Sequence, residues 1–402
     1  MMKILHCIID EKFIDGIMEV FDHAGGDVEH HYVYFPEGTN SSRFRYLKRG
    51  DRISVADRKQ ALRFVNTSGC QVMVMHNLSA FPIEQLPLVD RSIIVLWLAW
   101  GYDLYMPFKG HRPLIPIKLY QPLTQKTVNH DYFNHLRMMA KRTRWHILNY
   151  NKKVEQGVAR IDYFSGVIPW EHEMLTHHSF FHAKRVDFTY FDMKPYATHE
   201  NIDMPTASGS NILLGNSAGE TNNHIDVMKR LSSIDLNDKK IIAPLSYAGR
   251  KDYVKRVVAA GQHYFGSRFI PLNTFIPLVE YQQLFESCQY AIYAIERQQA
   301  LSNVWLALWN GLTVFMSKTS PLYQHLNRQG YHLFTVQDDL HLIAENYALT
   351  HEQVMHNRAV RLKYNSQEVN MKKVTTLWQL LKDDLERRKG RTTAESNTTD
   401  IK

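Results

Sequence analysis

The chain has 402 residues, a formal net charge of +8, and 44% hydrophobic and 12% aromatic residues. That length exceeds one ordinary hydrophobic core, so two domains of up to about 200 residues each are expected. No apolar run approaches the roughly 18 residues that a membrane-spanning helix needs, and residues 1–10 fit a first buried strand better than a signal peptide.

The first half of the chain alternates short apolar strands with helices. Because both faces of the strands are apolar, they fit a parallel sheet that helices cover on both sides. Strands are predicted at 3–9, 31–35, 71–76, 92–97 and 161–167, and helices at 11–23, 56–67 and within 117–144. Residues 195–210 are rich in Pro, Ser, Thr, Asn and Gly and lack periodicity, so they are the predicted linker, with its core at 196–210.

The alternation restarts in the second half. Strands are predicted at 212–214, 240–244, 290–295 and 313–317, and helices at 223–231, 251–260, 280–287, 301–310 and through most of 351–388. The composition of 391–402 is typical of a disordered tail.

Two such alternations predict an α/β protein with two facing Rossmann-like domains. The N-terminal domain is predicted over residues 1–195, and the C-terminal domain over residues 211–390. Its last helix could pack back on the first domain. Ligands of such sheets bind at the carboxyl ends of the strands, so the site is expected in the interdomain cleft.

Cysteine and histidine spacing gives no sign of a metal. Cys7, Cys70 and Cys288 fall in or beside predicted strands, so we interpret them as reduced core thiols of a cytoplasmic protein. The segment from His172 to His177 is similar to a zincin motif but has one residue too many between its glutamate and second histidine. No metal site is therefore expected.

One strand–loop–helix crossing of the second domain suits an anionic ligand. An apolar strand runs into Gly215, Asn216 and Ser217, and a helix opens near Asn222. Such a turn lets backbone N–H groups approach a diphosphate, which the helix N-terminus also favours. The simpler alternative is that Asn216 and Ser217 only cap the helix.

A second crossing downstream carries Arg297, Gln298 and Gln299 between a strand and a helix. Arg297 would supply a permanent bidentate cation to the leaving diphosphate, and the two glutamines could hold sugar groups or the second phosphate. His224 either reaches the diphosphate or faces solvent, and Tyr247 either contacts the nucleotide or is simply packed.

The first domain offers a carboxylate after its most apolar strand. Trp100, Gly101, Tyr102 and Asp103 form a loop expected to look into the cleft. Asp103 could orient or deprotonate an acceptor hydroxyl, or it could cap the following turn. His76 ends the preceding strand and either contacts the donor sugar or hydrogen-bonds locally.

Together these residues resemble the family 56 glycosyltransferases, from the first strand to about residue 330. Order and spacing carry the resemblance, in residues 100–105, 214–217, 223–224, 297–299, Pro244 and Tyr247. Glu296 and the His-rich segment 171–182 depart from the family pattern.

The resemblance implies a GT-B architecture and a retaining hexosyltransferase of class EC 2.4, without an essential metal or other cofactor. The implied donor is dTDP-linked 4-acetamido-4,6-dideoxygalactose (Fuc4NAc), and the implied acceptor is a polyprenyl-diphosphate-linked glycan of bacterial surface polysaccharide synthesis. The implied location is peripheral, at the cytoplasmic face of the inner membrane.

The positive charge gathers at 43–49, 141–145 and 386–391, where aromatic and apolar residues interleave the first two clusters. This pattern fits an anionic membrane surface, and solvated faces are the alternative. Nucleic acid is disfavoured because no binding signature accompanies the charge. A non-catalytic sugar-nucleotide-binding protein remains an alternative, whereas an oxidoreductase is disfavoured because no G-x-G-x-x-G follows the first strand.

Overall fold

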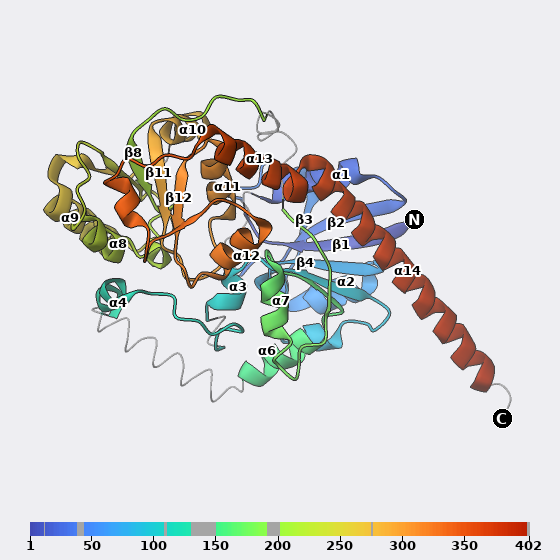
Figure 1. Cartoon of the computed structure of the whole chain (residues 1–402). Helices are drawn as coiled ribbons and strands as arrows, with labels where there is room; N and C mark the ends of the chain where they lie inside the picture. Colours follow the sequence, from blue (N-terminus) through green and yellow to red (C-terminus); the bar gives the residue numbers. More distant parts are fainter. Residues whose placement is uncertain are drawn as a thin grey trace. The chain divides into compact units, whose positions relative to one another are not determined.

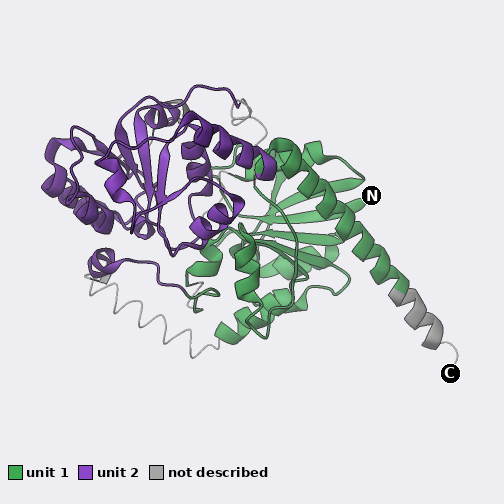
Figure 2. Ribbon diagram, viewed as in Figure 1, with its two compact units in different colours: residues 1–116, 141–197, 365–402 green, residues 117–140, 198–364 purple. Residues whose placement is uncertain are grey.

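The computed structural model describes residues 1–11, 13–37, 44–107, 111–129, 150–190, 202–274 and 276–399. The chain forms two compact units, each built on one parallel sheet (Figure 2). Unit 1 comprises residues 1–116, 141–197 and 365–402, and unit 2 comprises residues 117–140 and 198–364.

Unit 1 holds a seven-stranded sheet of order β3-β2-β1-β4-β5-β6-β7, in which all neighbours are parallel. Its strands are β1 (Met2–Ile8), β2 (Val28–Tyr34), β3 (Ile53–Val55), β4 (Val72–His76), β5 (Ile94–Leu98), β6 (Tyr163–Ser165) and β7 (Lys184–Arg185). Its helices are α1 (Ile14–Ala24), α2 (Ala61–Thr67), α3 (Tyr102–Tyr105), α6 (Tyr150–Ala159), α7 (Pro169–Leu175) and α14 (Gln367–Thr399). The strand order reverses between β1 and β4, which is the switch point of a Rossmann sheet.

Unit 2 repeats this topology in a six-stranded parallel sheet of order β10-β9-β8-β11-β12-β13 (Figure 1). Its strands are β8 (Asn211–Leu214), β9 (Ile241–Pro244), β10 (Phe269–Leu272), β11 (Cys288–Tyr293), β12 (Thr313–Met316) and β13 (Phe334–Thr335). Its helices are α4 (Pro122–Asn129), α8 (His224–Leu231), α9 (Lys251–Phe265), α10 (Leu278–Glu286), α11 (Leu301–Trp309), α12 (Pro321–Gln329) and α13 (His351–Asn365). Its switch point lies between β8 and β11.

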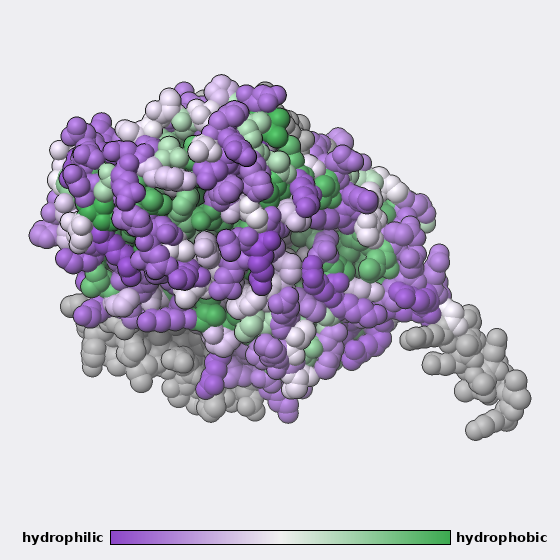
Figure 3. All heavy atoms as spheres, in the orientation of Figure 1, coloured by the Kyte–Doolittle hydropathy of each residue, from purple (hydrophilic) through white to green (hydrophobic). Residues whose placement is uncertain are grey.

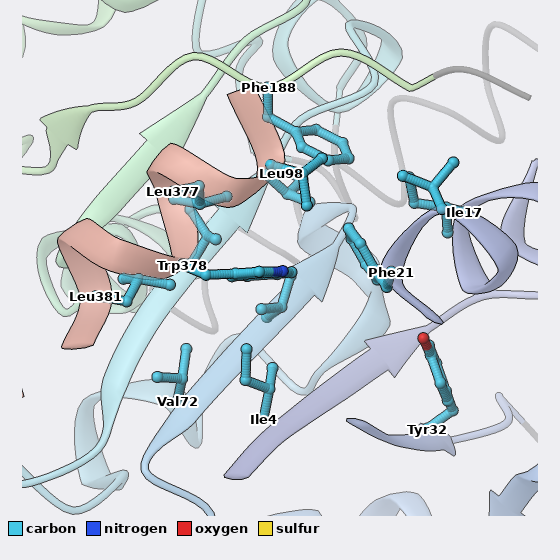
Figure 4. Close-up of a cluster of buried hydrophobic side chains, with 14 of the residues drawn as sticks. Ile4, Ile17, Phe21, Tyr32, Val72, Leu98, Phe188, Leu377, Trp378 and Leu381 are labelled. Carbon is cyan, nitrogen blue, oxygen red and sulfur yellow. The ribbon is translucent and has the colours of Figure 1, made fainter. Parts of the chain in front are cut away.

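The units are discontinuous in sequence, and the last helix lies with unit 1, where the sequence analysis allowed it to pack. Helix α14 belongs to unit 1 because its apolar face completes that core: Trp378 packs at 5.1 Å from the ring of Phe21 and close to the strands (Figure 4). The helix also continues past Arg391 to Thr399, where the composition predicts a disordered tail. Conversely, residues 117–140 belong to unit 2 although the prediction places them in the first domain.

Most of the predicted helical region over 117–144 lies outside the described residues, and its described helix, α4, covers only Pro122–Asn129. The missed strands β3, β7, β10 and β13 are the edges of the two sheets. The three cysteines are buried free thiols, as predicted.

Among the described residues, no helix has the length and apolar character needed to cross a bilayer. The face drawn in Figure 3 is mainly hydrophilic, with apolar side chains scattered in small groups. The largest exposed hydrophobic side chains include Phe13, Tyr46, Tyr102 and Tyr247.

Candidate active site

The turn after β8 is shaped around a glycine. Gly215 has φ +72°, and a Cβ there would lie 2.9 Å from both Asn222 Oδ1 and His224 Nε2. Asn222 then fixes the turn, because its Oδ1 accepts from the Asn216 N–H at 3.1 Å and its Nδ2 donates to the Ser217 carbonyl at 3.0 Å. The sequence indicated Asn222 only as the place where a helix opens, since nothing local reveals a side chain that folds back.

The two polar crossings of unit 2 are joined directly. Gln299 Nε2 donates to Asn216 Oδ1 at 3.2 Å, and the Thr221 hydroxyl donates to Gln299 Oε1 at 2.7 Å. Neither Asn216 nor Ser217 is the N-cap of α8; that position is Asn223, without a side-chain capping hydrogen bond. The helix-cap alternative is therefore wrong, because Asn216 bonds to the loop after β11 instead.

The loop after β9 joins the same edge of the sheet. The Tyr247 hydroxyl donates to the Asn216 carbonyl at 2.9 Å, while 44% of the residue stays exposed. Arg250 Nε donates to Glu220 Oε1 at 3.1 Å, which brings a second arginine to this edge. The sequence analysis missed Arg250, because its relation to the first crossing is visible only in three dimensions.

His224 is fully buried behind the glycine turn, so the alternative that it faces solvent is wrong. Its Nδ1 is 3.2 Å from the Tyr253 hydroxyl, whereas its buried Nε2 has no hydrogen-bond partner among the described residues. Burial lowers the pKa of His224 to about 4, and the backbone of Ser217 offsets this only in part. We assign the hydroxyl as donor to Nδ1, which leaves a neutral ring with its proton on Nε2, beside Gly215.

The loop after β11 carries the charged groups of the site. Arg297 is half-buried and its Nη1 donates to the carbonyl of Gln298, whose own side chain is 5% exposed. Glu296 accepts from the Ser317 hydroxyl at 2.9 Å and from the Thr319 hydroxyl at 2.6 Å. Glu296 thus joins the carboxyl ends of β11 and β12, a position that its sequence departure alone did not indicate.

In unit 1, Asp103 is turned inward rather than toward solvent. Its Oδ2 accepts from the Leu78 N–H at 3.1 Å and from Trp97 Nε1 at 3.0 Å, and its Oδ1 accepts from the Trp100 N–H at 3.0 Å. Only 2% of the residue is exposed, and burial raises the pKa of its carboxyl. The carboxylate therefore fixes the loops after β4 and β5, a structural role that differs from the cap of the following turn offered as the alternative.

His76 lies in a chain of buried imidazoles. His6 is hydrogen-bonded at 2.9 Å to His76 on one side and to His30 on the other, and His76 is also bonded at 2.7 Å to the Tyr190 hydroxyl. Burial lowers the pKa of His76 to about 3 and that of His30 to about 4. Both ring nitrogens of His76 are engaged, which favours the local hydrogen-bonding alternative over a contact with the donor sugar.

The remaining predicted residues of unit 1 are more accessible. Gly101 has φ +82° and starts α3, and Tyr102 is 41% exposed. The ring of Trp100 lies 6.1 Å from that of Phe13, so aromatic side chains from two loops meet at the carboxyl edge of this sheet. Their predicted role toward an acceptor stays a prediction.

The described residues contain no group of three or more side chains arranged to hold a metal. Two histidines of the rejected motif region donate to backbone carbonyls instead: His172 to Ala183 at 3.0 Å and His178 to Leu114 at 2.6 Å.

Comparisons with known proteins agree with this architecture. A family model described as 4-alpha-L-fucosyltransferase, glycosyl transferase group 56, matches residues 89–364. The structure is similar to a glycosyltransferase from Rickettsia africae, at a TM-score of 0.60 and 9% identity over 94% of this chain and 98% of that one. It is also similar to HepE from Anabaena in complex with UDP and glucose, at a TM-score of 0.61 and 12% identity over 94% and 100%. At such identities the likeness shows the fold, and the predicted GT-B class is confirmed.

Proposed function

Because the chain belongs to the 4-alpha-L-fucosyltransferase family, glycosyl transferase group 56, we propose that this glycosyltransferase takes its sugar from a nucleotide diphosphate bound at the switch point of unit 2. The observation that carries the proposal is the cross-linked edge after β8 and β11. There the buried Nε2 of His224, which forms no hydrogen bond of full geometry among the described residues, lies beside the Gly215 turn, and Arg297 lies in the loop after the neighbouring strand β11. Neutral donors and a cation fixed before the reaction are what a departing diphosphate requires.

The roles of the individual residues follow from their contacts. His224 Nε2–H donates to a phosphate oxygen, and Arg297 balances the charge of the diphosphate. Glu296 accepts from three side chains, including Gln121, and a carboxylate has about four acceptor positions, so Oε2 can take a sugar hydroxyl.

The reaction is a retaining transfer that uses the leaving group as its base. The bond between the anomeric carbon and the diphosphate oxygen breaks, and the acceptor oxygen bonds to that carbon on the same face. The acceptor proton passes to the leaving phosphate. No proton is routed through Asp103, because its carboxylate is buried and fixes loops inside unit 1.

The finer assignment follows the family resemblance. The donor is dTDP-linked and carries a deoxy-amino sugar such as 4-acetamido-4,6-dideoxygalactose, the acceptor is a polyprenyl-diphosphate-linked glycan, and no metal is required. HepE was crystallised with UDP and glucose, which makes UDP the first competing nucleotide to test. Membership in a glycosyltransferase family favours this enzyme over a non-catalytic sugar-nucleotide-binding protein.

We extend the proposal to an anionic membrane surface at the cytoplasmic face of the inner membrane. Support comes from the loop around Tyr46, whose backbone N–H and those of its two neighbours donate to the carboxylate of Asp10. Tyr46 is 40% exposed and Arg45 lies 5.0 Å from its ring, so a cation and an aromatic ring are displayed together. Of the other two basic clusters, 141–145 lies outside the described residues, and Arg388 in the last one is paired with Asp162 at 2.8 Å.

Calorimetric titration with dTDP, UDP and GDP, with and without Mg²⁺, tests the donor site. Wild type should bind dTDP at micromolar concentration without the metal. Arg297→Ala should weaken binding by about tenfold or more, whereas Arg297→Lys should lose less because it keeps the charge. Preference for another nucleotide would change the donor only, and absence of any binding would overturn the proposal.

A further inference from the structure

Residues 117–129 form a short arm that joins unit 2 although its sequence lies between strands β5 and β6 of unit 1. The arm consists of an irregular stretch, 117–121, followed by α4, which packs against α8 and α9 (Figure 1). None of the residues predicted for the donor site lies in this arm.

The arm is held by two buried side chains of unit 2. The carboxylate of Asp226, on α8, accepts from the N–H groups of Leu123 and Thr124, each at 2.8 Å. It thereby satisfies two of the amides that the start of α4 leaves without a helical partner. Asn223 Oδ1 accepts from the Gln121 N–H at 2.8 Å.

Asn223 also ties the arm to the edge of the sheet that carries the site. It is fully buried, and its Nδ2 donates to the Ala294 carbonyl at the end of β11 and to the Leu119 carbonyl in the arm, at 2.7 and 3.3 Å. Gln121 Nε2 then donates to Glu296 Oε1 at 3.0 Å. The arm therefore contacts the loop that precedes Arg297 directly through the side chain of Gln121, and its backbone is joined to the end of β11 through Asn223.

Tyr120 lies between these two anchored residues and is half-buried. Burial raises the pKa of Tyr120; Glu220 adds to the rise, whereas Arg250 and Arg297 oppose it. Its neighbours Leu119 and Gln121 are both hydrogen-bonded to Asn223, so Tyr120 is held at this edge of the sheet, near the charged groups of the loops after β8, β9 and β11.

We propose that the arm completes the donor site, with Tyr120 contacting the nucleoside diphosphate and Gln121 positioning Glu296 for the sugar. The inference rests on the proposed function of the same edge. The two residues affect different parts of the donor. Tyr120 contacts the nucleoside diphosphate, which is present with or without a sugar. Gln121 acts through Glu296 and matters only when a sugar is attached.

The test compares dTDP with dTDP-glucose by calorimetry. Tyr120→Phe should weaken both ligands by about tenfold or more, the loss expected for one hydrogen bond to a charged group. Gln121→Ala should weaken dTDP-glucose by a similar factor and leave dTDP unchanged, a split that a merely structural role would not produce. Lys126→Ala, on the exposed part of α4, should bind both ligands as wild type does.

Asp226→Asn loosens the anchor without touching the ligand, so it should weaken both ligands while the melting temperature shows that the protein stays folded. If wild type binds dTDP and all of these variants bind both ligands equally well, the arm inference fails alone. If wild type binds no nucleoside diphosphate, the proposed function fails and the inference with it.

Discussion

The two sheets share one strand order, yet the polar residues at their carboxyl edges are used in different ways. In unit 1, Asp103 and His76 face inward and their polar atoms are engaged by neighbouring protein groups. In unit 2, Asn216 and Gln299 join two loops, and the buried Nε2 of His224 has no partner among the described residues. Position at a strand end therefore does not identify a functional residue. The hydrogen-bond inventory of each side chain separates a group that holds the protein together from one that is ready for a ligand.

The largest effect that would sharpen this comparison is the pH dependence of stability. Burial holds the pKa values of His6, His30 and His76 below the ordinary value of about 6.5, so the unfolded chain binds protons first as pH falls. Their contribution to stability is complete above pH 6.5 and is lost as pH falls toward the folded values. His76 alone should lose about 2 kcal/mol between pH 7 and pH 5, as measured by urea unfolding.

Two variants test whether the histidines of unit 1 cause this dependence of unfolding free energy on pH. His30→Phe removes one titrating ring, so the slope of unfolding free energy against pH should fall by the equivalent of up to about one bound proton. His177→Gln, at an exposed position, should leave that slope unchanged. His224 in unit 2 adds to the wild-type slope, since burial lowers its pKa too. An unchanged slope in His30→Phe would show that the imidazole chain does not titrate as its burial requires.

The next effect concerns the glycine turn of unit 2. Gly215→Ala would place a Cβ 2.9 Å from Asn222 and His224 at φ +72°, so it should cost about 1–2 kcal/mol of stability and weaken dTDP binding by more than about tenfold. Gly69→Ala is the matched control, because Gly69 has φ +71° but no atom within 4 Å of the added Cβ. It isolates backbone strain from crowding. Equal dTDP affinity in Gly215→Ala and wild type would remove this turn from the binding site.

The success of the sequence analysis followed the strength of local patterns. The interior strands of both sheets were predicted because buried parallel strands are continuously apolar, as in β5, where all of Ile94–Leu98 is buried. The missed strands β3, β7, β10 and β13 are short edge strands with partly exposed residues, and β10, although apolar, contains Pro271, which is unusual inside a strand. The disordered tail was predicted from the composition of the last residues alone. That composition gives no sign that the same helix, α14, packs an apolar face into the core of unit 1 earlier in its length.

The residues of the candidate site also fall into those that local sequence patterns predict and those that they do not. Glycine, amide and arginine positions after strands were visible because turn chemistry is local, and two of the predicted crossings do meet. Asn222, Arg250 and the 117–129 arm were missed because their roles depend on partners distant in sequence: Gln121 reaches Glu296 across 175 positions. The inward orientation of Asp103 was equally hidden, since an indole N–H and two loop amides decide it.

The variant with the smallest expected effect on dTDP binding is the one that can contradict the comparison of the two edges. Asp103→Asn keeps the shape but turns one acceptor into a donor facing Leu78, Trp97 or Trp100, so unfolding free energy should fall by about 1–3 kcal/mol. Affinity for dTDP should not change, because every group that Asp103 contacts lies in unit 1. Asp51→Asn, at an exposed position of the same unit, controls for loss of a negative charge.

If Asp103→Asn instead unfolds like wild type and binds dTDP normally but transfers no sugar, Asp103 is catalytic. The carboxyl edge of unit 1 would then take part in the transfer, and a full set of hydrogen bonds would no longer mark a residue as structural.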